Sequence, residues 1–278
     1  MAATAAFFFA TMPVAARLVY GGAGRDPLAL LAIRFTLGAA LLWLFRPRGD
    51  SPPQKGEWPW LALAAAGLVL TSAAYFLALR TVPAATAVLL VYTYPAFTAL
   101  FARLFWREPL GPRRIAALLL TFTGGAALIG RPGEPFADAP LFGMALALCG
   151  GLTYAAFGLG GQRLMRVRSA AWVNRWAVTG AALAFLAARP PVFWAAGGRP
   201  LFLGGLYLGF VATYLANTLY LAAVREVGAT RAGLYSTMEP VFTALLAWLA
   251  LGEGFSPWQA AGAGLVILGV LGLEGLAG

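Results

Sequence analysis

Long apolar stretches separated by short polar segments dominate the chain. Each stretch has about 20 residues, the length that an α-helix needs to cross the hydrocarbon core of a bilayer. Glycines and prolines, which end helices, are concentrated between the stretches. The pattern predicts an all-α membrane protein with ten transmembrane helices. We expect them at residues 4–22, 27–45, 59–79, 84–105, 114–130, 140–161, 170–188, 201–223, 231–251 and 257–276.

Composition narrows the class of protein further. Of the 278 residues, 61% are hydrophobic and 11% are charged, whereas about 25% are charged in an ordinary soluble domain. The chain has no histidine and one cysteine, which excludes histidine-ligated metals, histidine-dependent triads and CxxC redox pairs. Cys149 lies in an apolar stretch and is expected to be buried, without a chemical role. We therefore expect neither an enzyme nor a cofactor or metal.

The distribution of the basic residues predicts sidedness. The net charge is +10, and the basic residues form short clusters between apolar stretches, which suits lipid headgroups better than nucleic acid. The first stretch has no basic segment before it, so we interpret it as a retained helix and not a signal peptide. With both termini in the cytoplasm, the inside loops hold an excess of basic residues, as membrane proteins generally do. These residues are Arg46, Arg48, Lys55, Arg103, Arg107, Arg113, Arg114, Arg163, Arg166, Arg168, Arg225 and Arg231.

An internal repeat divides the chain into two halves. The sequence YPAFTAL at 94–100 recurs as EPVFTAL at 239–245, a displacement of 145 residues. The same displacement relates Glu108 to Glu253. The repeat predicts two five-helix units, residues 1–138 and 139–278. Because five is odd, the second unit enters the membrane from the opposite side. Inverted repeats suit alternating access, so the architecture indicates a transporter.

Several residues recur at matched positions of the two halves. They are Arg34–Phe35 and Arg175–Trp176 in the second helix of each half, Pro95 and Pro240 in the fourth, Glu108 and Glu253 at its end, and Gly124 and Gly269 in the fifth. This pattern resembles the EamA type of the drug/metabolite transporter superfamily. Within it, the run LVYTYP at 90–95 is most similar to the YddG group of aromatic and neutral amino-acid exporters. The resemblance implies a multi-pass protein of the bacterial inner membrane.

Polar and aromatic side chains within the apolar stretches indicate a substrate cavity. Lipid offers polar groups no partner, so they face the interior of the bundle. Deep tyrosines suit a ligand with an aromatic or apolar face, although helix packing is the alternative. The fifth and tenth helices have almost no polar residue and are expected at the outside. The expected substrate-binding residues are Ser72, Tyr75, Tyr92, Tyr94, Tyr154, Arg175, Trp176, Tyr214, Asn217, Tyr220 and Glu239.

Two arginines within predicted spans need partners, since an unpaired charge there costs at least about 2.5 kcal/mol. Arg175 and Glu239 enter the membrane from the same side to a similar depth, so we predict an ion pair between them. Tyr94 holds the position symmetric to Glu239, so Arg34 is expected to bond there or to carbonyls freed by Pro95. A structural role is favoured for both arginines, with binding of a substrate carboxylate as the alternative.

The predicted function is export of amino acids, aromatic or neutral ones first, and of similar small metabolites by alternating access. Pro95 and Pro240 are expected to act as hinges, because each removes a helix hydrogen bond. The alternative is multidrug or organic-cation efflux, which a Glu239 free of Arg175 would favour. Glu239 is also the candidate for proton coupling. The expected partners are a small-molecule substrate and the lipid bilayer, with no nucleic acid, and the chain is treated as a monomer.

Overall fold

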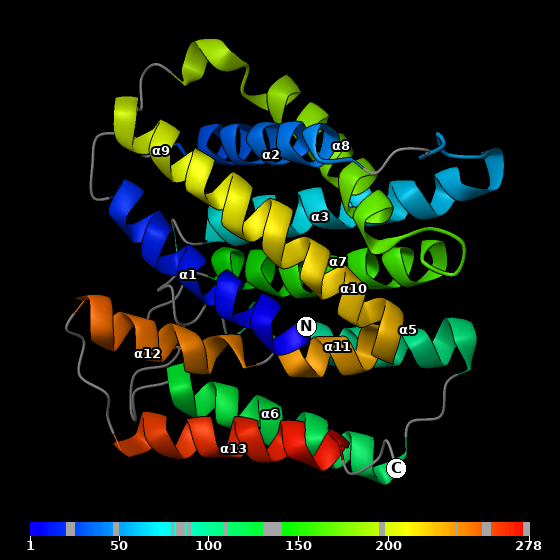
Figure 1. Cartoon of the computed structure of the whole chain (residues 1–278). Helices are drawn as coiled ribbons and strands as arrows, with labels where there is room; N and C mark the ends of the chain where they lie inside the picture. The colour runs from blue at the N-terminus through cyan, green and yellow to red at the C-terminus, as the bar shows by residue number, and fades with distance from the viewer. Residues whose placement is uncertain are drawn as a thin grey trace.

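A computed structural model describes most of the chain. The described residues are 1–20, 26–46, 50–78, 81, 87, 90–107, 111–129, 141–194, 198–236, 238–251 and 257–274. Within these ranges the regular structure is helical and no strand occurs (Figure 1).

The described helices follow the predicted stretches closely. In the first half they are α1 (Ala2–Tyr20), α2 (Pro27–Leu44), the short turn η1 (Lys55–Glu57), α3 (Trp58–Ala78), α5 (Tyr94–Trp106) and α6 (Pro112–Ile129). In the second half they are α7 (Leu141–Leu164), α8 (Ala170–Ala188), η2 (Pro191–Phe193), α9 (Gly198–Leu208), the π-helix η4 (Gly209–Ala216), α10 (Asn217–Val227), α11 (Ala229–Ser236), α12 (Glu239–Leu251) and α13 (Pro257–Glu274).

Several of these helices have the length and apolar composition of a membrane span. Among the described residues, four helical segments are long and apolar enough to cross a membrane: Pro27–Leu44, Lys55–Ala78, Leu141–Leu164 and Gly198–Val227. The last joins α9, η4 and α10 into one continuous helical segment. Multi-pass helical architecture is therefore supported by the described helices, while the full ten-helix topology remains a prediction.

Local sequence signals set several helix starts. Asp26 precedes α2 and accepts hydrogen bonds from the backbone N–H of Leu28 at 3.0 Å and Ala29 at 3.3 Å, with Pro27 in the first turn. Ser169 accepts from Trp172 N at 3.1 Å at the start of α8. Such caps satisfy backbone donors that have no partner within the helix.

The fourth and ninth predicted helices are both interrupted near their prolines. Residues 92–93 form a turn before α5 begins at Tyr94, and α11 ends at Ser236 before α12 begins at Glu239. Pro95 and Pro240 therefore lie in the first turn of a new helix, where a missing N–H costs no helical hydrogen bond. The sequence predicted kinks at these points, and the structure has an interruption at each.

The two interruptions share local structure. Two backbone hydrogen bonds at the first have counterparts 145 residues further along at the second. The bond from Thr93 N to Leu90 O (3.2 Å) matches the bond from Met238 N to Tyr235 O (3.2 Å). The bond from Phe97 N to Thr93 O (3.3 Å) matches the bond from Phe242 N to Met238 O (3.1 Å).

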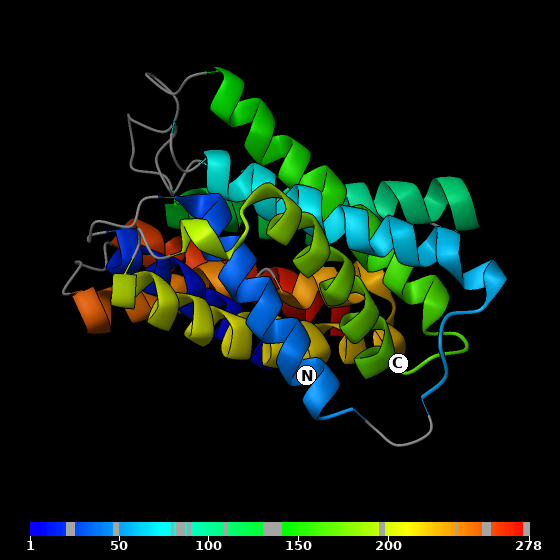
Figure 2. The same cartoon turned by 90° about the horizontal axis from the view of Figure 1, so that it is seen from above.

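Helix packing follows a pattern that exchange of the two halves would preserve. Helix α5 packs on α7 as α12 packs on α1, while α2 packs on α8 and α6 on α13. Helices α6 and α13 lie together at one edge of the bundle, as expected for the helices with almost no polar residue (Figure 1). Helices α3 and α7 also pack closely, and Figure 2 shows them from above.

A glycine allows the close approach of α3 to α7. A Cβ atom at Gly67 would lie 2.6 Å from Phe157 N and 2.7 Å from Thr153 O, both backbone atoms of α7. No side chain fits at those distances.

The outward face of α7 corrects one expectation: Cys149 is exposed on the protein surface and not buried. An apolar stretch alone does not tell which of its faces points outward.

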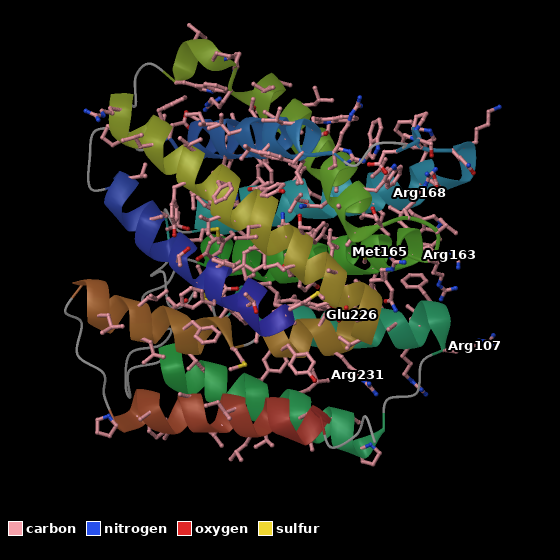
Figure 3. The ribbon with its side chains drawn as sticks, viewed as in Figure 1. Arg107, Arg163, Met165, Arg168, Glu226 and Arg231 are labelled. Atoms are coloured by element: carbon pink, nitrogen blue, oxygen red, sulfur yellow. The ribbon has the colours of Figure 1, made fainter. Side chains whose placement is uncertain are left out.

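The ends of the helices gather charges as the sidedness analysis predicted. Arg107, Arg163, Arg168 and Arg231, which come from both halves of the chain, lie at the same end of the bundle (Figure 3). The orientation of this end relative to the cytoplasm remains a prediction.

Candidate functional site

A cavity lies among α1, α2, α3, α7 and α10, next to the two helix interruptions. Its empty volume is about 700 Å³, open solvent at its mouth included. The helices α5 and α12 both begin at this cavity, with Tyr94 and Glu239 in its wall. The lining residues are Phe9, Met12, Arg34, Leu68, Thr71, Ser72, Tyr75, Phe76, Val91, Tyr92, Tyr94, Tyr154, Asn217 and Glu239.

Tyrosines form much of the cavity wall. The rings of Tyr94 and Tyr154 meet edge to face with centroids 4.7 Å apart, and Tyr92 lies 6.1 Å from Tyr94. The Tyr94 hydroxyl donates to the Gly233 carbonyl on α11 at 2.8 Å. This bond links the two interrupted helices and fixes the ring of Tyr94. The wall therefore offers aromatic faces to a ligand.

A guanidinium group and a carboxyl group lie in the same cavity. Arg34 from α2 and Glu239 from α12 both line it and interact electrostatically. Arg34 is 4% exposed, and its Nε donates to Thr213 Oγ1 at 2.9 Å. Its Nη1 donates to Met12 Sδ at 3.3 Å, and its guanidinium lies 4.9 Å from the Phe35 ring centre.

The contact of Arg34 with Thr213 was not predicted from the sequence. It arises because α2 packs against η4. A π-helix is wider than an α-helix and is frequent at functional sites.

The predicted ion pair of Arg175 with Glu239 is wrong. Arg175 Nη2 instead forms an ion pair with Asp50, in the segment between α2 and α3. The guanidinium also lies 5.2 Å from the Trp43 ring centre. The depth of a residue along a helix was estimated from the sequence, but the direction of its side chain around the helix was not.

Further contacts hold the same segment to the start of α8. Arg168 Nε and Nη2 donate to the two carboxylate oxygens of Glu57 at 2.7 and 3.0 Å. Trp172 Nε1 donates to Ser51 O at 2.9 Å. We refer to Asp50, Glu57, Arg168, Trp172 and Arg175 as the loop clamp. The clamp joins two segments that the sequence predicted on the same side of the membrane.

A weaker ion pair lies between α2 and α8 at their other ends. Arg189 Nε donates to Asp26 Oδ2 at 2.8 Å, and both side chains are more than one-third exposed. Burial by itself would raise the pKa of Asp26. The hydrogen bond and charge of Arg189, with the backbone N–H groups of Ala29 and Leu28, outweigh burial and hold this pKa below its ordinary value.

The structure brings together most of the predicted binding residues and separates the others. Arg175 and Trp176 lie in an aromatic cluster with Trp43, and Tyr214 packs on Phe45 and Phe210, outside the lining of the cavity. Tyr220 packs behind Tyr154 with ring centres 5.6 Å apart. The predicted residues that line the cavity are Ser72, Tyr75, Tyr92, Tyr94, Tyr154, Asn217 and Glu239.

The sequence missed the apolar part of the lining. Phe9, Met12, Leu68, Phe76 and Val91 line the cavity, yet nothing distinguishes them in the sequence from residues that face lipid. In the described part of the chain, no group of three His, Cys, Asp or Glu side chains is placed to hold a metal ion.

Comparison with known proteins agrees with a transport function. An uncharacterized transporter of Archaeoglobus fulgidus is 28% identical over 255 residues, which cover 88% of this chain and 86% of that protein. The threonine/homoserine exporter RhtA of Escherichia coli is 28% identical over 202 residues, 71% of this chain and 65% of RhtA. The aromatic amino acid exporter YddG of Ancylobacter novellus is 30% identical over 146 residues, about half of each chain (51% and 50%).

The fold and the family both extend over nearly the whole chain. A protein of known crystal structure superposes with a TM-score of 0.79 at 24% sequence identity, covering 99% of this chain and 95% of that one. The sequence profile of the EamA-like transporter family matches residues 1–130 and 141–274. The chain therefore belongs to the EamA-like transporter family: it is a multi-pass membrane transporter of a small-molecule substrate, and not an enzyme.

Proposed function

We propose that the protein exports amino acids with aromatic or other apolar side chains by alternating access. The observation that carries this proposal is the presence of Arg34 and Glu239 in one tyrosine-lined cavity. A zwitterion presents one group for each charge. A simple cation complements Glu239 alone and a simple anion complements Arg34 alone, so a zwitterion offers the best electrostatic match.

The rest of the lining supports an apolar side chain on the substrate. Tyr75, Phe76 and Tyr154 present aromatic surface, and Phe9 and Leu68 extend it. Only a few polar groups converge on this surface. Small-molecule sites typically combine an apolar wall with a few polar groups that fix orientation.

The names of two relatives support the same class of substrate. RhtA is a threonine/homoserine exporter and YddG an aromatic amino acid exporter. Threonine is polar and aromatic amino acids are apolar, so the relatives share the amino-acid head group and differ in the side chain. The head group is the part that the two cavity charges would recognise.

Alternating access is supported by the two helix interruptions at the cavity. In many transporters, broken helices from inverted repeats meet at a substrate site near the middle of the membrane. Here α5 and α12 begin at the cavity, with matched backbone hydrogen bonds before each. We propose Pro95 and Pro240 as the hinges, residues 1–138 and 139–278 as the repeats, and an orientation in the bacterial inner membrane with both termini in the cytoplasm.

A second candidate function is efflux of organic cations. It is favoured by the contacts of Arg34, whose Nε and Nη1 are already bonded to Thr213 and Met12. Arg175 forms its ion pair with Asp50 and not with Glu239, which leaves the Glu239 carboxylate available to a cation. If the charge of Arg34 is fully used by these contacts, Glu239 becomes the dominant charge for a ligand.

Counterflow in proteoliposomes tests the two functions. Liposomes with the purified protein would be loaded with phenylalanine or threonine, and uptake of the labelled amino acid would be measured. Competitors would be phenethylamine, which lacks the carboxylate, and 3-phenylpropionate, which lacks the ammonium. The amino-acid proposal expects competition by amino acids and weaker competition by both analogues. Uptake of tetraphenylphosphonium without any amino-acid counterflow would favour cation efflux instead.

A further inference from the structure

Two buried polar atoms in the cavity wall have no partner with regular hydrogen-bond geometry. Among the described residues, the buried side-chain atoms without partners include Asn217 Nδ2 and Tyr92 Oη, and both residues line the cavity. Asn217 is 1% exposed and Tyr92 is 8% exposed. Buried polar groups are nearly always bonded, so each orphan needs an explanation. A substrate that supplies the missing partners is one.

The surroundings of Asn217 favour a negatively charged partner. Asn217 begins α10, one helical turn after Thr213. Thr213 holds the Nε of Arg34, so the free amide lies on the cationic side of the cavity. The bonds of Arg34 to Thr213 and Met12 use two of its donors. Arg34 thus supplies charge, while Asn217 supplies an N–H group that no protein atom accepts.

The surroundings of Tyr92 favour a positively charged partner. Its hydroxyl lies beside the Glu239 carboxyl group and interacts with it, but without the geometry of a regular hydrogen bond. A hydroxyl oxygen and a carboxylate are both acceptors for the N–H groups of an ammonium. Asn217 Nδ2 therefore lies on the side of the cavity that holds Arg34, and Tyr92 Oη lies on the side that holds Glu239.

We propose that Asn217 is the specificity residue that binds the substrate carboxylate, and that Tyr92 and Glu239 together bind the ammonium. The proposal rests on the amino-acid transport proposed above and adds the orientation of the substrate within the cavity. In this proposal the uncharged amide of Asn217 distinguishes amino acids from amines, because Arg34 is already bonded to Thr213 and Met12.

Ligand-induced thermal stabilisation of the purified protein tests the proposal. Phenylalanine and phenethylamine would be titrated against the wild type and Asn217→Leu, which keeps the approximate size and removes the amide. A hydrogen bond to a charged group is worth about tenfold or more in affinity. The ratio of phenylalanine affinity to phenethylamine affinity is expected to fall at least about tenfold. An unchanged ratio would overturn the proposal.

Two further variants separate specificity from structure. Asn217→Asp is nearly isosteric and places a negative charge beside the carboxylate, so it should reverse the preference in favour of phenethylamine. If Asn217→Leu does not fold, the affinity ratio of Asn217→Asp tests the role of Asn217 by itself. Asn174→Leu is the matched control, since Asn174 is a buried asparagine whose Nδ2 donates to Thr213 O and Thr218 Oγ1. It should lower the melting temperature without changing the affinity ratio. An equal change of the ratio in Asn174→Leu would contradict a specific role for Asn217.

The outcomes also distinguish this proposal from the function on which it rests. If the wild type binds no amino acid but binds phenethylamine, both fail and the cavity recognises cations. If the wild type binds phenylalanine and Asn217→Asp keeps the wild-type ratio, the orientation proposed here fails while amino-acid transport stands.

Discussion

Removal of Asp50 should strand a buried charge and destabilise the protein. Arg175 is 1% exposed, its Nε already lacks a partner, and Asp50 is 22% exposed. Breaking a fully buried pair from one side costs about 3 to 5 kcal/mol. Because Asp50 is partly hydrated, we expect Asp50→Asn to cost about 2 to 3 kcal/mol. Arg175→Met should cost less, since the Asp50 left behind can reach water.

A double-mutant cycle measures this interaction directly. Unfolding in detergent mixtures of increasing denaturing strength would give the free energy for the wild type, Asp50→Asn, Arg175→Met and the double mutant. We expect a coupling energy of about 1 to 3 kcal/mol, in the upper part of the range of about 0.5 to 3 kcal/mol for residues in contact. The cycle of Arg175→Met with Glu239→Gln is the matched control and should be additive within about 0.5 kcal/mol. Additivity for Asp50, or strong coupling to Glu239, would refute this account of Arg175.

Four other predictions concern separate parts of the molecule. Gly67→Ala should cost about 1 to 3 kcal/mol in unfolding free energy, because a Cβ there meets the backbone of α7. Above pH 3.8, the ordinary carboxyl pKa, Asp26→Asn should slightly lower the stability of the protein, because the pKa of Asp26 is lowered in the folded state. The difference in melting temperature between the wild type and Asp26→Asn should shrink as the pH falls below that value. If Glu239 carries protons, Glu239→Gln should keep exchange and lose uphill transport driven by a pH gradient; retained uphill transport would exclude that role. With Cys149→Ala as a background that keeps transport, Arg107→Cys should react with impermeant thiol reagents only from the cytoplasm.

The fold was largely predictable because the physical signals are simple. A bilayer requires apolar stretches of a fixed length, and prolines such as Pro112 and Pro257 mark helix starts. The interruptions near Pro95 and Pro240 were indicated as kinks by the same chemistry. The π-helix η4 was not predictable, since residues 209–216 are apolar and carry no signal of their own.

The candidate site was predictable only in part. Polar residues in spans point inward, which is why Ser72, Asn217 and Glu239 converge on one cavity. The partner of Arg175 was not predicted because Asp50 lies in a polar segment between two helices, where a carboxylate is expected to be exposed to water. Side chains on several sides of a helix can face the interior of the bundle. The neighbour that each one contacts depends on how the helices pack, which the sequence pattern does not specify.

Substrate protection of a cavity residue tests the central claim most directly. Ser72 lines the cavity and is 7% exposed. In a Cys149→Ala background that retains counterflow, Ser72→Cys would be treated with a small thiol reagent, and the modification rate would be measured with and without phenylalanine. We predict that phenylalanine slows the modification in a saturable manner while 3-phenylpropionate at the same concentration does so far less. Equal modification rates in a protein that still catalyses phenylalanine counterflow would show that the amino acid passes elsewhere.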